Sequence, residues 1–333
     1  EDGIRDGPQC LVGSEMCIRD RQIIRGVHNC RKIHQNGVLT IGNFDGLHLG
    51  HQKILEQLRI EAEQHNTHSC LMTLEPLPRE YFARGKPTAT RLMSRSEKMR
   101  VLSTIDAGIR PDYLLFLRFD QSLANMSATQ FIDTILVDKL KVRSVIIGDD
   151  FRFGCDRKGD FSLLQKYGKK YQFSVIKMDS HCIKNERVSS SLIRDALAND
   201  ALSKADKMLG RAYTICGHIN HGDKRGRTIG FPTANIHLQR TETPLSGVYS
   251  VTMHSKKFGD VAGIANLGRR PTVGGERVQL EVHLFDFDQS IYGMHVCISF
   301  QHKIRDEVKF KSFDDLKQQI KIDCEKAKRL LEK

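Results

Sequence analysis

The segment 48–51 (HLGH) holds two histidines whose type and spacing suit a site that handles phosphate groups. They are three residues apart, so both imidazoles would lie on the same face of the first turn if a helix begins there. Ring N–H groups in this position, together with the free backbone N–H groups of a helix N-terminus, can donate hydrogen bonds to phosphate oxygens. Such donors stabilise the negative charge that builds on a leaving pyrophosphate, so His48 and His51 are candidates for catalysis of transfer from ATP.

The residues around this pair decide between a nucleotide site and two exposed loop histidines, which is the usual meaning of an isolated His-x-x-His. Gly42 and Gly46 precede the pair and permit a tight turn, and Gly50 lets a phosphate approach the helix backbone. Residues 38–41 form an apolar, β-prone run before the turn, and apolar residues at helical spacing follow it. In open parallel sheets, ligands bind where a strand ends and a helix begins. The context therefore favours a nucleotide site.

A second segment with possible phosphate chemistry spans residues 217–230 and carries Gly217, Gly222, Gly226 and Gly230 near basic side chains. A glycine-rich loop of this kind can surround phosphates with backbone N–H groups. It is not a Walker-type loop, since the Gly-Lys-Ser/Thr ending is absent. Barrels rich in turns also use many glycines, so the glycine spacing alone leaves both interpretations open.

The elements that must position these residues fall into two parts. In the N-terminal part, short β-prone runs alternate with helical patterns, which predicts a parallel sheet flanked by helices. The predicted strands are residues 38–41, 70–74, 113–117, 144–148 and 173–177. Apolar residues between 47 and 62 fall on one face of a helix that begins just after the first strand, and residues 131–140 and 191–198 look helical in the same way.

The C-terminal part has closely spaced strands with turn residues between them, which predicts a small antiparallel β-barrel. These strands are residues 213–219, 233–238, 247–254, 261–267, 278–287 and 295–304. A terminal helix follows, opened by Ser312 with Asp315 as its capping partner, and its apolar face should pack on the barrel. We therefore predict an α/β Rossmann-like domain over residues 21–200 and a barrel domain over residues 205–333, with the boundary near 196–210.

Residues 1–20 (EDGIRDGPQCLVGSEMCIRD) show neither helical nor strand periodicity. They also lack the basic start and continuous apolar stretch of a signal peptide. They resemble translated sequencing-adaptor sequence. We therefore treat them as an adaptor-derived, non-native extension and leave them out of the fold predictions.

The composition excludes some classes of protein and leaves others open. The 333-residue chain is 39% hydrophobic and 28% charged, with no apolar run near the roughly 18 residues that span a bilayer. It is therefore typical of a cytoplasmic enzyme without a membrane partner. Its nine cysteines show no Cys-x-x-Cys pair and no zinc-ligand spacing, which predicts reduced thiols in a reducing compartment. The net charge of +12 suits a nucleic-acid partner as well as a positive field for nucleotide phosphates.

Four segments together resemble the nucleotidyltransferase superfamily and, within it, the FAD synthetase domain of bacterial bifunctional riboflavin kinase/FAD synthetases. Their order and spacing match that family over roughly residues 21–200. The segments are residues 42–51 (GNFDGLHLGH), 73–82 (TLEPLPREYF), 148–154 (GDDFRFG) with Arg157 and Gly159, and 187–194 (RVSSSLIR).

The resemblance implies which residues of this part bind ATP. In that family a serine-rich element at a helix start binds the ATP phosphates, and here Ser191 stands where threonine is more common; both supply a hydroxyl. Alone, the segment would be a plain serine N-cap. Arg194 would join His48 and His51 in neutralising phosphate charge during adenylyl transfer. The ATP-binding residues expected in this part are Gly42, Phe44, Asp45, Gly46, Gly50, Asp150, Ser189, Ser190 and Ser191.

Residues 231–235 (FPTAN) resemble the riboflavin kinase motif in which threonine and asparagine help hold ATP and Mg²⁺. Thr233 and Asn235 are two residues apart and would face the same side of a strand, so hydroxyl and amide can converge on one metal-phosphate group. The match also gives more weight to ATP binding by the glycines at 217, 222, 226 and 230.

Two further segments resemble the same family. Residues 280–287 (LEVHLFDF) match a motif whose glutamate is the base, which here is Glu281; it would take the proton of the ribityl 5′-hydroxyl as that oxygen attacks the γ-phosphate. Arg305, Glu307 and Phe310 lie in a segment similar to the one that borders the isoalloxazine ring. They are the expected flavin-binding residues.

The resemblance implies an enzyme of flavin cofactor synthesis. Its C-terminal domain would phosphorylate riboflavin to FMN, and its N-terminal domain would adenylylate FMN to FAD and release pyrophosphate, with ATP as co-substrate and Mg²⁺ as cofactor. One alternative is a nucleic-acid-binding protein, which the lack of tryptophan and of an aromatic stacking array disfavours. Another is an adenylyltransferase with a non-catalytic barrel, which the set Thr233, Asn235 and Glu281 disfavours. The oligomeric state is not predicted.

Overall fold

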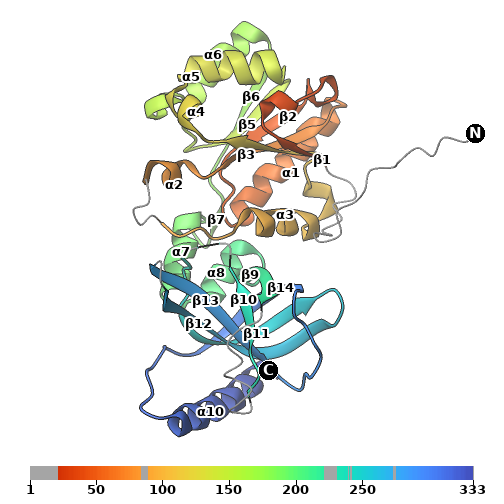
Figure 1. Ribbon diagram of the computed structural model, residues 1–333. Helices are drawn as coiled ribbons and strands as arrows, with labels where there is room; N and C mark the ends of the chain where they lie inside the picture. The colour runs from red at the N-terminus through yellow and green to blue at the C-terminus, as the bar shows by residue number, and fades with distance from the viewer. Residues whose placement is uncertain are drawn as a thin grey trace, which may run out of the picture.

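The computed structural model describes residues 22–83, 89–220, 231–238, 240, 242–272 and 275–332. Figure 1 shows an α/β part at the top and a β-barrel part below it, with the C-terminal helix against the barrel. The expected ATP-binding residues Gly222, Gly226 and Gly230, and the extension 1–20, lie outside the described residues. Within the described ranges, no helix is both long and apolar enough to cross a lipid bilayer.

The α/β part is built on a six-stranded sheet with the order β1-β4-β3-β2-β5-β6, in which every neighbouring pair is parallel. Its strands are β1 (Gln22–Arg25), β2 (Val38–Ile41), β3 (Ser69–Glu75), β4 (Tyr113–Arg118), β5 (Ser144–Gly148) and β6 (Ser174–Met178). The five strands expected from the sequence are confirmed. Strand β1 is an addition: its sequence QIIR has only two apolar residues between polar ones, and it becomes a strand by pairing with β4 at the sheet edge.

Helices cover both faces of this sheet because its strands carry apolar residues on both sides. The helices are α1 (Leu49–Gln64), α2 (Pro78–Ala83), α3 (Arg95–Thr104), α4 (Gln121–Asn125), α5 (Ala128–Gln130), the π-wound η4 (Phe131–Lys139), α6 (Phe161–Tyr171), α7 (Ser190–Ala198) and α8 (Leu202–Leu209). α1 and α3 pack on one face, and η4 and α6 pack on the other. Adjacent strand residues alternate between the two cores: Val38 with Leu39, Leu71 with Met72, and Leu114 with Leu115. The predicted Rossmann-like architecture is confirmed.

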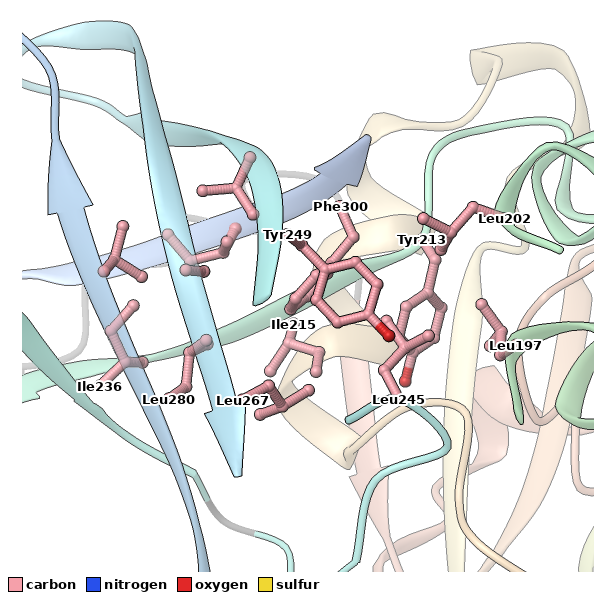
Figure 2. Close-up of a cluster of buried hydrophobic side chains, with 14 of the residues drawn as sticks. Leu197, Leu202, Tyr213, Ile215, Ile236, Leu245, Tyr249, Leu267, Leu280 and Phe300 are labelled. Atoms are coloured by element: carbon pink, nitrogen blue, oxygen red, sulfur yellow. The ribbon is translucent and has the colours of Figure 1, made fainter. Parts of the chain in front are cut away.

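The C-terminal part is a closed antiparallel barrel with the strand order β10-β13-β12-β11-β14-β9. Its strands are β9 (Thr214–Asn220), β10 (Ala234–His237), β11 (Gly247–Ser255), β12 (Gly259–Thr272), β13 (Gly275–Leu284) and β14 (His295–Arg305). Figure 2 shows Ile215, Ile236, Leu267 and Leu280 gathered in its core. The six predicted strands and the barrel are confirmed.

The terminal helix α10 (Phe313–Leu331) packs on the outside of the barrel, as expected from its apolar face. Its N-cap Ser312 accepts a hydrogen bond from the backbone N–H of Asp315 at 3.1 Å. Cys324 and Ala327 on the helix lie in one apolar cluster with Val248, Ile264, Phe285 and Ile304 of the barrel.

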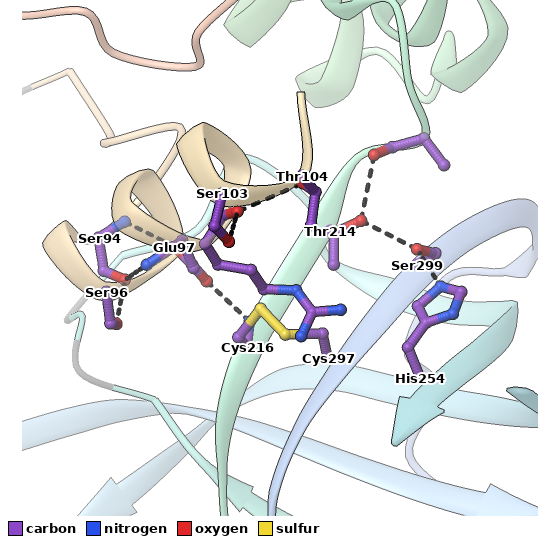
Figure 3. Close-up of a disulfide and its surroundings, with 12 residues drawn as sticks. Ser94, Ser96, Glu97, Ser103, Thr104, Thr214, Cys216, His254, Cys297 and Ser299 are labelled. Carbon is purple, nitrogen blue, oxygen red and sulfur yellow. Dashed lines mark hydrogen bonds between the residues drawn. A yellow bond between two sulfur atoms is a disulfide. The ribbon is translucent and has the colours of Figure 1, made fainter. Parts of the chain in front are cut away.

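The junction between the two parts is continuous. Leu197 of α7 and Leu202 of α8 lie in the same buried cluster as barrel residues such as Phe300 (Figure 2). On the other side, Glu97 of α3 accepts the backbone N–H of Cys216 at 2.8 Å (Figure 3). Glu97 also pairs with Arg240. The predicted boundary near 196–210 falls on α7 and α8, which pack in the barrel's cluster, so the domain limits stay predictions.

Cys216 on β9 and Cys297 on β14 form a disulfide (Figure 3), which corrects the expectation that all the cysteines are reduced thiols. They face each other directly across the antiparallel strand pair, with their Cα atoms 4.1 Å apart. The expectation was wrong because the two residues are 81 positions apart, and cysteine spacing does not reveal the register of two strands. The other described cysteines, at 30, 70, 155, 182 and 324, are free thiols.

Candidate functional site

The two histidines of segment 48–51 lie at the start of α1, just beyond the end of β2. His48 is the N-cap, and its Nδ1 accepts a hydrogen bond from the backbone N–H of His51 at 3.3 Å. Since Nδ1 accepts, the proton of the neutral ring sits on Nε2, where it can be donated to a ligand. The two rings stack with their centroids 3.6 Å apart. Nδ1 of His51 is buried and has no hydrogen-bond partner among the described residues, so the hydrogen bonds of this part of the chain leave it unused.

Burial keeps both imidazoles neutral. Desolvation lowers the pKa of His48 to about 4; the charge of Asp45 opposes this shift and that of Arg211 adds to it. Desolvation also lowers the pKa of His51 well below its usual value, with His48 and Lys98 contributing. At neutral pH the histidines therefore offer N–H dipoles, and full positive charges must come from neighbouring arginines.

We expect His48 of the ligand-free protein to titrate with a midpoint near pH 4. Because a histidine in the unfolded chain titrates near about 6.5, the unfolded state binds more protons between these values. The free energy of unfolding that this group contributes is thus fully present above about pH 6.5 and is lost as pH falls toward 4. NMR of ¹⁵N-labelled imidazoles, assigned with His48→Gln, measures the midpoint directly. A His48 midpoint near 6.5 would contradict the burial-driven shift.

Asp45 lies in the turn before α1, and its buried carboxylate is bound by four donors. Oδ1 accepts the backbone N–H groups of Leu92 at 3.0 Å and Met93 at 3.2 Å. Oδ2 accepts from the guanidinium groups of Arg79 at 2.9 Å and Arg194 at 3.1 Å. The structure thus places Asp45, an expected ATP contact, where it holds two arginines at the turn before α1.

The serine-rich segment forms the N-terminus of α7 and meets the same turn. Ser189 is the N-cap, whose Oγ accepts a first-turn backbone N–H at 3.2 Å, which is the role expected of the segment standing alone. Ser190 Oγ donates to the backbone carbonyl of Asp45 at 2.8 Å. Arg194 donates to Ser191 Oγ at 3.5 Å. The N-termini of α1 and α7 therefore converge, and their positive ends suit a bound phosphate group.

The expected glycines occupy the turn itself. Gly42 directly follows β2, and Gly46 has a φ of 90°, in the left-handed region that favours glycine. Gly50 lies in the first turn of α1, where a Cβ would stand 3.2 Å from the ring of His48. A larger residue at position 50 would press on the imidazole.

Two other expected ATP contacts, Phe44 and Asp150, differ in how far they are buried. Phe44 is buried, and its ring centroid is 4.7 Å from that of His51, so it supports that imidazole. Asp150, just after β5, is exposed and forms an ion pair with Arg187 at 2.7 Å. Only Asp150 of these two presents polar atoms to the surface, so a direct nucleotide contact suits it better than Phe44.

Lys98 of α3 is a site residue that the sequence reasoning missed. Its Nζ donates to the backbone carbonyl of Asn43 at 2.6 Å and to Thr73 Oγ1 at 2.9 Å. Burial lowers its pKa to about 8. Helical spacing gives no signal for a buried lysine, and the same holds for Arg79, whose partner Asp45 is distant in sequence.

On the outer face of the barrel, polar side chains lie opposite one another on three strands. Asn235 of β10 and Asn266 of β12 are both paired in register with Glu281 of β13. Gln279 connects two of them: its Nε2 donates to Asn235 Oδ1 at 2.6 Å and to Glu281 Oε1 at 3.0 Å. The residues on either side of Glu281 are buried in the barrel core, so the row itself faces outward. Glu281 is thereby oriented at a polar surface.

The expected flavin-binding residues lie at the end of this row. Glu307 Oε1 accepts a hydrogen bond from Asn266 Nδ2 at 3.1 Å. Arg305 is paired with Asp323 of α10 at 2.8 Å, and its guanidinium carbon lies 5.5 Å from the centroid of Phe310. Oδ1 of Asn266 is buried without a hydrogen-bond partner in the described part of the chain. The segment 305–310 therefore borders the same polar row as Glu281.

A cavity of about 160 Å³ opens beside Thr233, which directly precedes β10. Its walls expose polar and apolar atoms in about equal measure, so it can offer a ligand hydrogen bonds as well as apolar contact. The lining residues include Ile219, Thr233, Val282, Leu284, Asp288, Gln289 and Tyr292.

Gly217 lies inside β9 rather than in a loop. A Cβ there would stand 2.4 Å from the backbone carbonyl oxygen of His237 on β10. The close approach of two strands explains the glycine without a ligand. Its assignment to ATP binding stays a prediction.

Two family models match consecutive parts of the chain. The model for FAD synthetase matches residues 30–192, which include both histidines and the serine-rich segment. The model for riboflavin kinase matches residues 209–331, which include Thr233, Asn235 and Glu281. The order of the two matches is the order of the two parts in the structure.

Relatives match over nearly the full length of both chains. A bifunctional riboflavin kinase/FMN adenylyltransferase from Haemophilus influenzae is 48% identical over 92% of this chain and 98% of its own. The protein of the same description from Escherichia coli is 46% identical, over 91% of this chain and 95% of its own. One from Pseudomonas fluorescens is 41% identical over 93% and 97%.

A solved structure has the same arrangement of the two parts. It is described as a macrolide-efflux protein from Streptococcus pneumoniae and aligns with a TM-score of 0.76. Its sequence is 29% identical, and the alignment covers 91% of this chain and 97% of that one. The similarity in fold therefore extends over both the sheet and the barrel.

Proposed function

We propose, because this chain belongs to the family of bifunctional riboflavin kinase/FMN adenylyltransferases, that it makes FAD from riboflavin in two steps. The barrel phosphorylates riboflavin to FMN with ATP. The α/β part then transfers the adenylyl group of a second ATP to FMN and releases pyrophosphate. The observation that carries this division is the presence of two separate polar sites, one at the start of α1 and one across β10, β12 and β13.

Adenylyl transfer needs no protein nucleophile. A phosphate oxygen of FMN attacks the α-phosphorus of ATP, and the bond to the β-phosphate oxygen breaks as pyrophosphate leaves. The Nε2–H of His48 and the ring of His51 donate to the oxygens on which charge builds. Arg194 supplies positive charge and is held in place by Asp45. The converging helix N-termini complete the anion site.

Riboflavin phosphorylation needs a base and an aligned γ-phosphate. The ribityl 5′-hydroxyl oxygen attacks the γ-phosphorus, its proton passes to the carboxylate of Glu281, and ADP leaves. The hydrogen bond from Gln279 fixes that carboxylate, so it is oriented before substrate arrives. Arg305, Glu307 and Phe310 border the flavin ring.

Thr233 and Asn235 fit a magnesium ion bound together with ATP. A hydroxyl and an amide oxygen are hard ligands of the kind that Mg²⁺ accepts beside phosphate oxygens. Gln279 orients the amide of Asn235 by donating to its Oδ1. The ion, when bound, neutralises charge on the phosphates.

The partners of the enzyme are small molecules: riboflavin, FMN, FAD and ATP, without a nucleic acid. The positive net charge of +12 serves to attract nucleotide phosphates. We place the enzyme in the cytoplasm, where ATP is made and used.

The direct test is to incubate the purified chain with riboflavin, ATP and MgCl₂ and to separate the flavins by chromatography. FMN should form first and FAD should follow; EDTA should stop both. A separate binding experiment on immobilised single-stranded DNA tests the nucleic-acid alternative. Retention of the protein that weakens as the salt concentration rises would favour that alternative. The absence of both FMN and FAD would overturn the proposal.

A further inference from the structure

Arg211 lies in the segment between α8 and β9, within the range matched by the riboflavin kinase model. Its guanidinium group nevertheless reaches the turn of the other site. We infer that Arg211 is a positioning residue for adenylyl transfer, supplied by the kinase side of the chain to hold the turn that carries His48. This inference rests on the proposed function of that turn.

The contacts of Arg211 are three backbone carbonyl groups. Nη2 donates to Gly46 O at 2.6 Å, and Nη1 donates to Leu47 O and Leu209 O, both at 3.2 Å. Gln52 of α1 reinforces the connection, since its Nε2 donates to the same carbonyls of Leu47 and Leu209, at 3.0 and 3.1 Å. The residue immediately before His48 is thus tied to the start of the barrel.

The turn needs such support because its backbone is strained. Phe44 has a φ of 45° and Leu47 a φ of 43°, in the left-handed region that bulky residues avoid. Strained backbone at a functional site persists only where the surrounding structure imposes it. Lys98 holds Asn43 at one end of the turn, and Arg211 holds Gly46 and Leu47 at the other. Without Arg211, Leu47 can relax and carry His48 with it.

The guanidinium group of Arg211 is directed at the turn, and it forms no close ion pair with the residues that the structure describes. Burial lowers its pKa to about 10, and the negative charges of Asp206 and Glu97 nearby oppose that shift only in part. Its guanidinium also helps to keep His48 neutral, since its charge lowers the pKa of that imidazole. If Arg211 stabilised only the barrel, its guanidinium group would not need to donate hydrogen bonds to the carbonyl groups of Gly46 and Leu47.

The test compares Arg211→Ala with the unaltered full-length chain in both reactions. For FMN adenylylation we expect kcat to fall about 10²-fold, the effect of misplacing a catalytic group by roughly 1 Å, while KM for ATP and FMN changes little. Riboflavin phosphorylation should keep its kcat, which also shows that the variant is folded. Arg211→Lys, and guanidinium ion added to Arg211→Ala, should each restore part of the adenylylation rate.

Arg100→Ala is the matched control, because Arg100 lines the same cavity between the two parts as Arg211 and, among the described residues, is not one of the donors to the turn. It should keep both activities. An Arg211→Ala variant with unchanged adenylylation overturns the inference, and so does an equal loss of both activities that guanidinium does not relieve. If the unaltered chain itself made no FAD from FMN, the proposed function would fail instead.

Discussion

Replacing His48 with alanine is expected to lower the rate of FMN adenylylation by about 10² to 10³-fold, the effect of losing one oriented donor to a developing oxyanion. Riboflavin phosphorylation should continue at the unaltered rate, because the hydrogen bond and the ring contact of His48 both join it to His51 of the same site. The variant supplied with riboflavin and ATP should therefore accumulate FMN. Initial rates of each step, measured separately from riboflavin and from FMN, check this.

The matched control is His65→Ala. His65 lies at the opposite end of α1, where it pairs with Glu61 at 3.1 Å, and its loss should leave both activities intact. If His48→Ala removed both activities from a protein that is still folded, the two sites would not be independent.

Replacing Glu281 with glutamine should stop riboflavin phosphorylation, with a loss of about 10² to 10⁴-fold, the range for removal of a general base. Glutamine keeps the size of the side chain but cannot take the proton of the 5′-hydroxyl. Adenylylation of added FMN should be unchanged. The expected pattern is the reverse of that for His48→Ala, so supplying FMN should restore FAD formation.

Asp260→Asn is the matched control for this change. Asp260 is an exposed carboxylate of the same barrel, paired with His254 at 2.7 Å, and it is remote in register from Glu281. Its substitution should leave phosphorylation unaltered. A Glu281→Gln variant that still phosphorylates riboflavin at the normal rate would remove Glu281 from the role of base.

Much of the fold was predictable because its signals are local. Buried parallel strands read as continuous apolar runs, as at Val145, Ile146 and Ile147, and the barrel strands are separated by turn residues. Strand β1 and the disulfide escaped prediction because both depend on pairing with distant strands. Pairing register is a property of the folded chain and leaves no mark on either segment alone.

The residues of the candidate sites also fall into a group that the sequence predicted and a group that it did not. His48, the serine N-cap at Ser189 and Glu281 belong to short segments whose residues resemble family motifs, so their types and spacing identified them. The supporting residues Lys98 and Arg211 make their contacts with carbonyl groups far away in sequence. Their function depends on burial and on the path of the backbone, and neither is visible as a pattern of residues.

The central claim, that one chain adds two different phosphorus atoms to riboflavin at two sites, is tested most directly by labelling ATP. With γ-³²P-ATP and riboflavin, both FMN and FAD should become labelled. With α-³²P-ATP, FAD alone should carry label and FMN should carry none. Label from α-³²P-ATP in FMN, or FAD without label from one of the two nucleotides, would contradict the account.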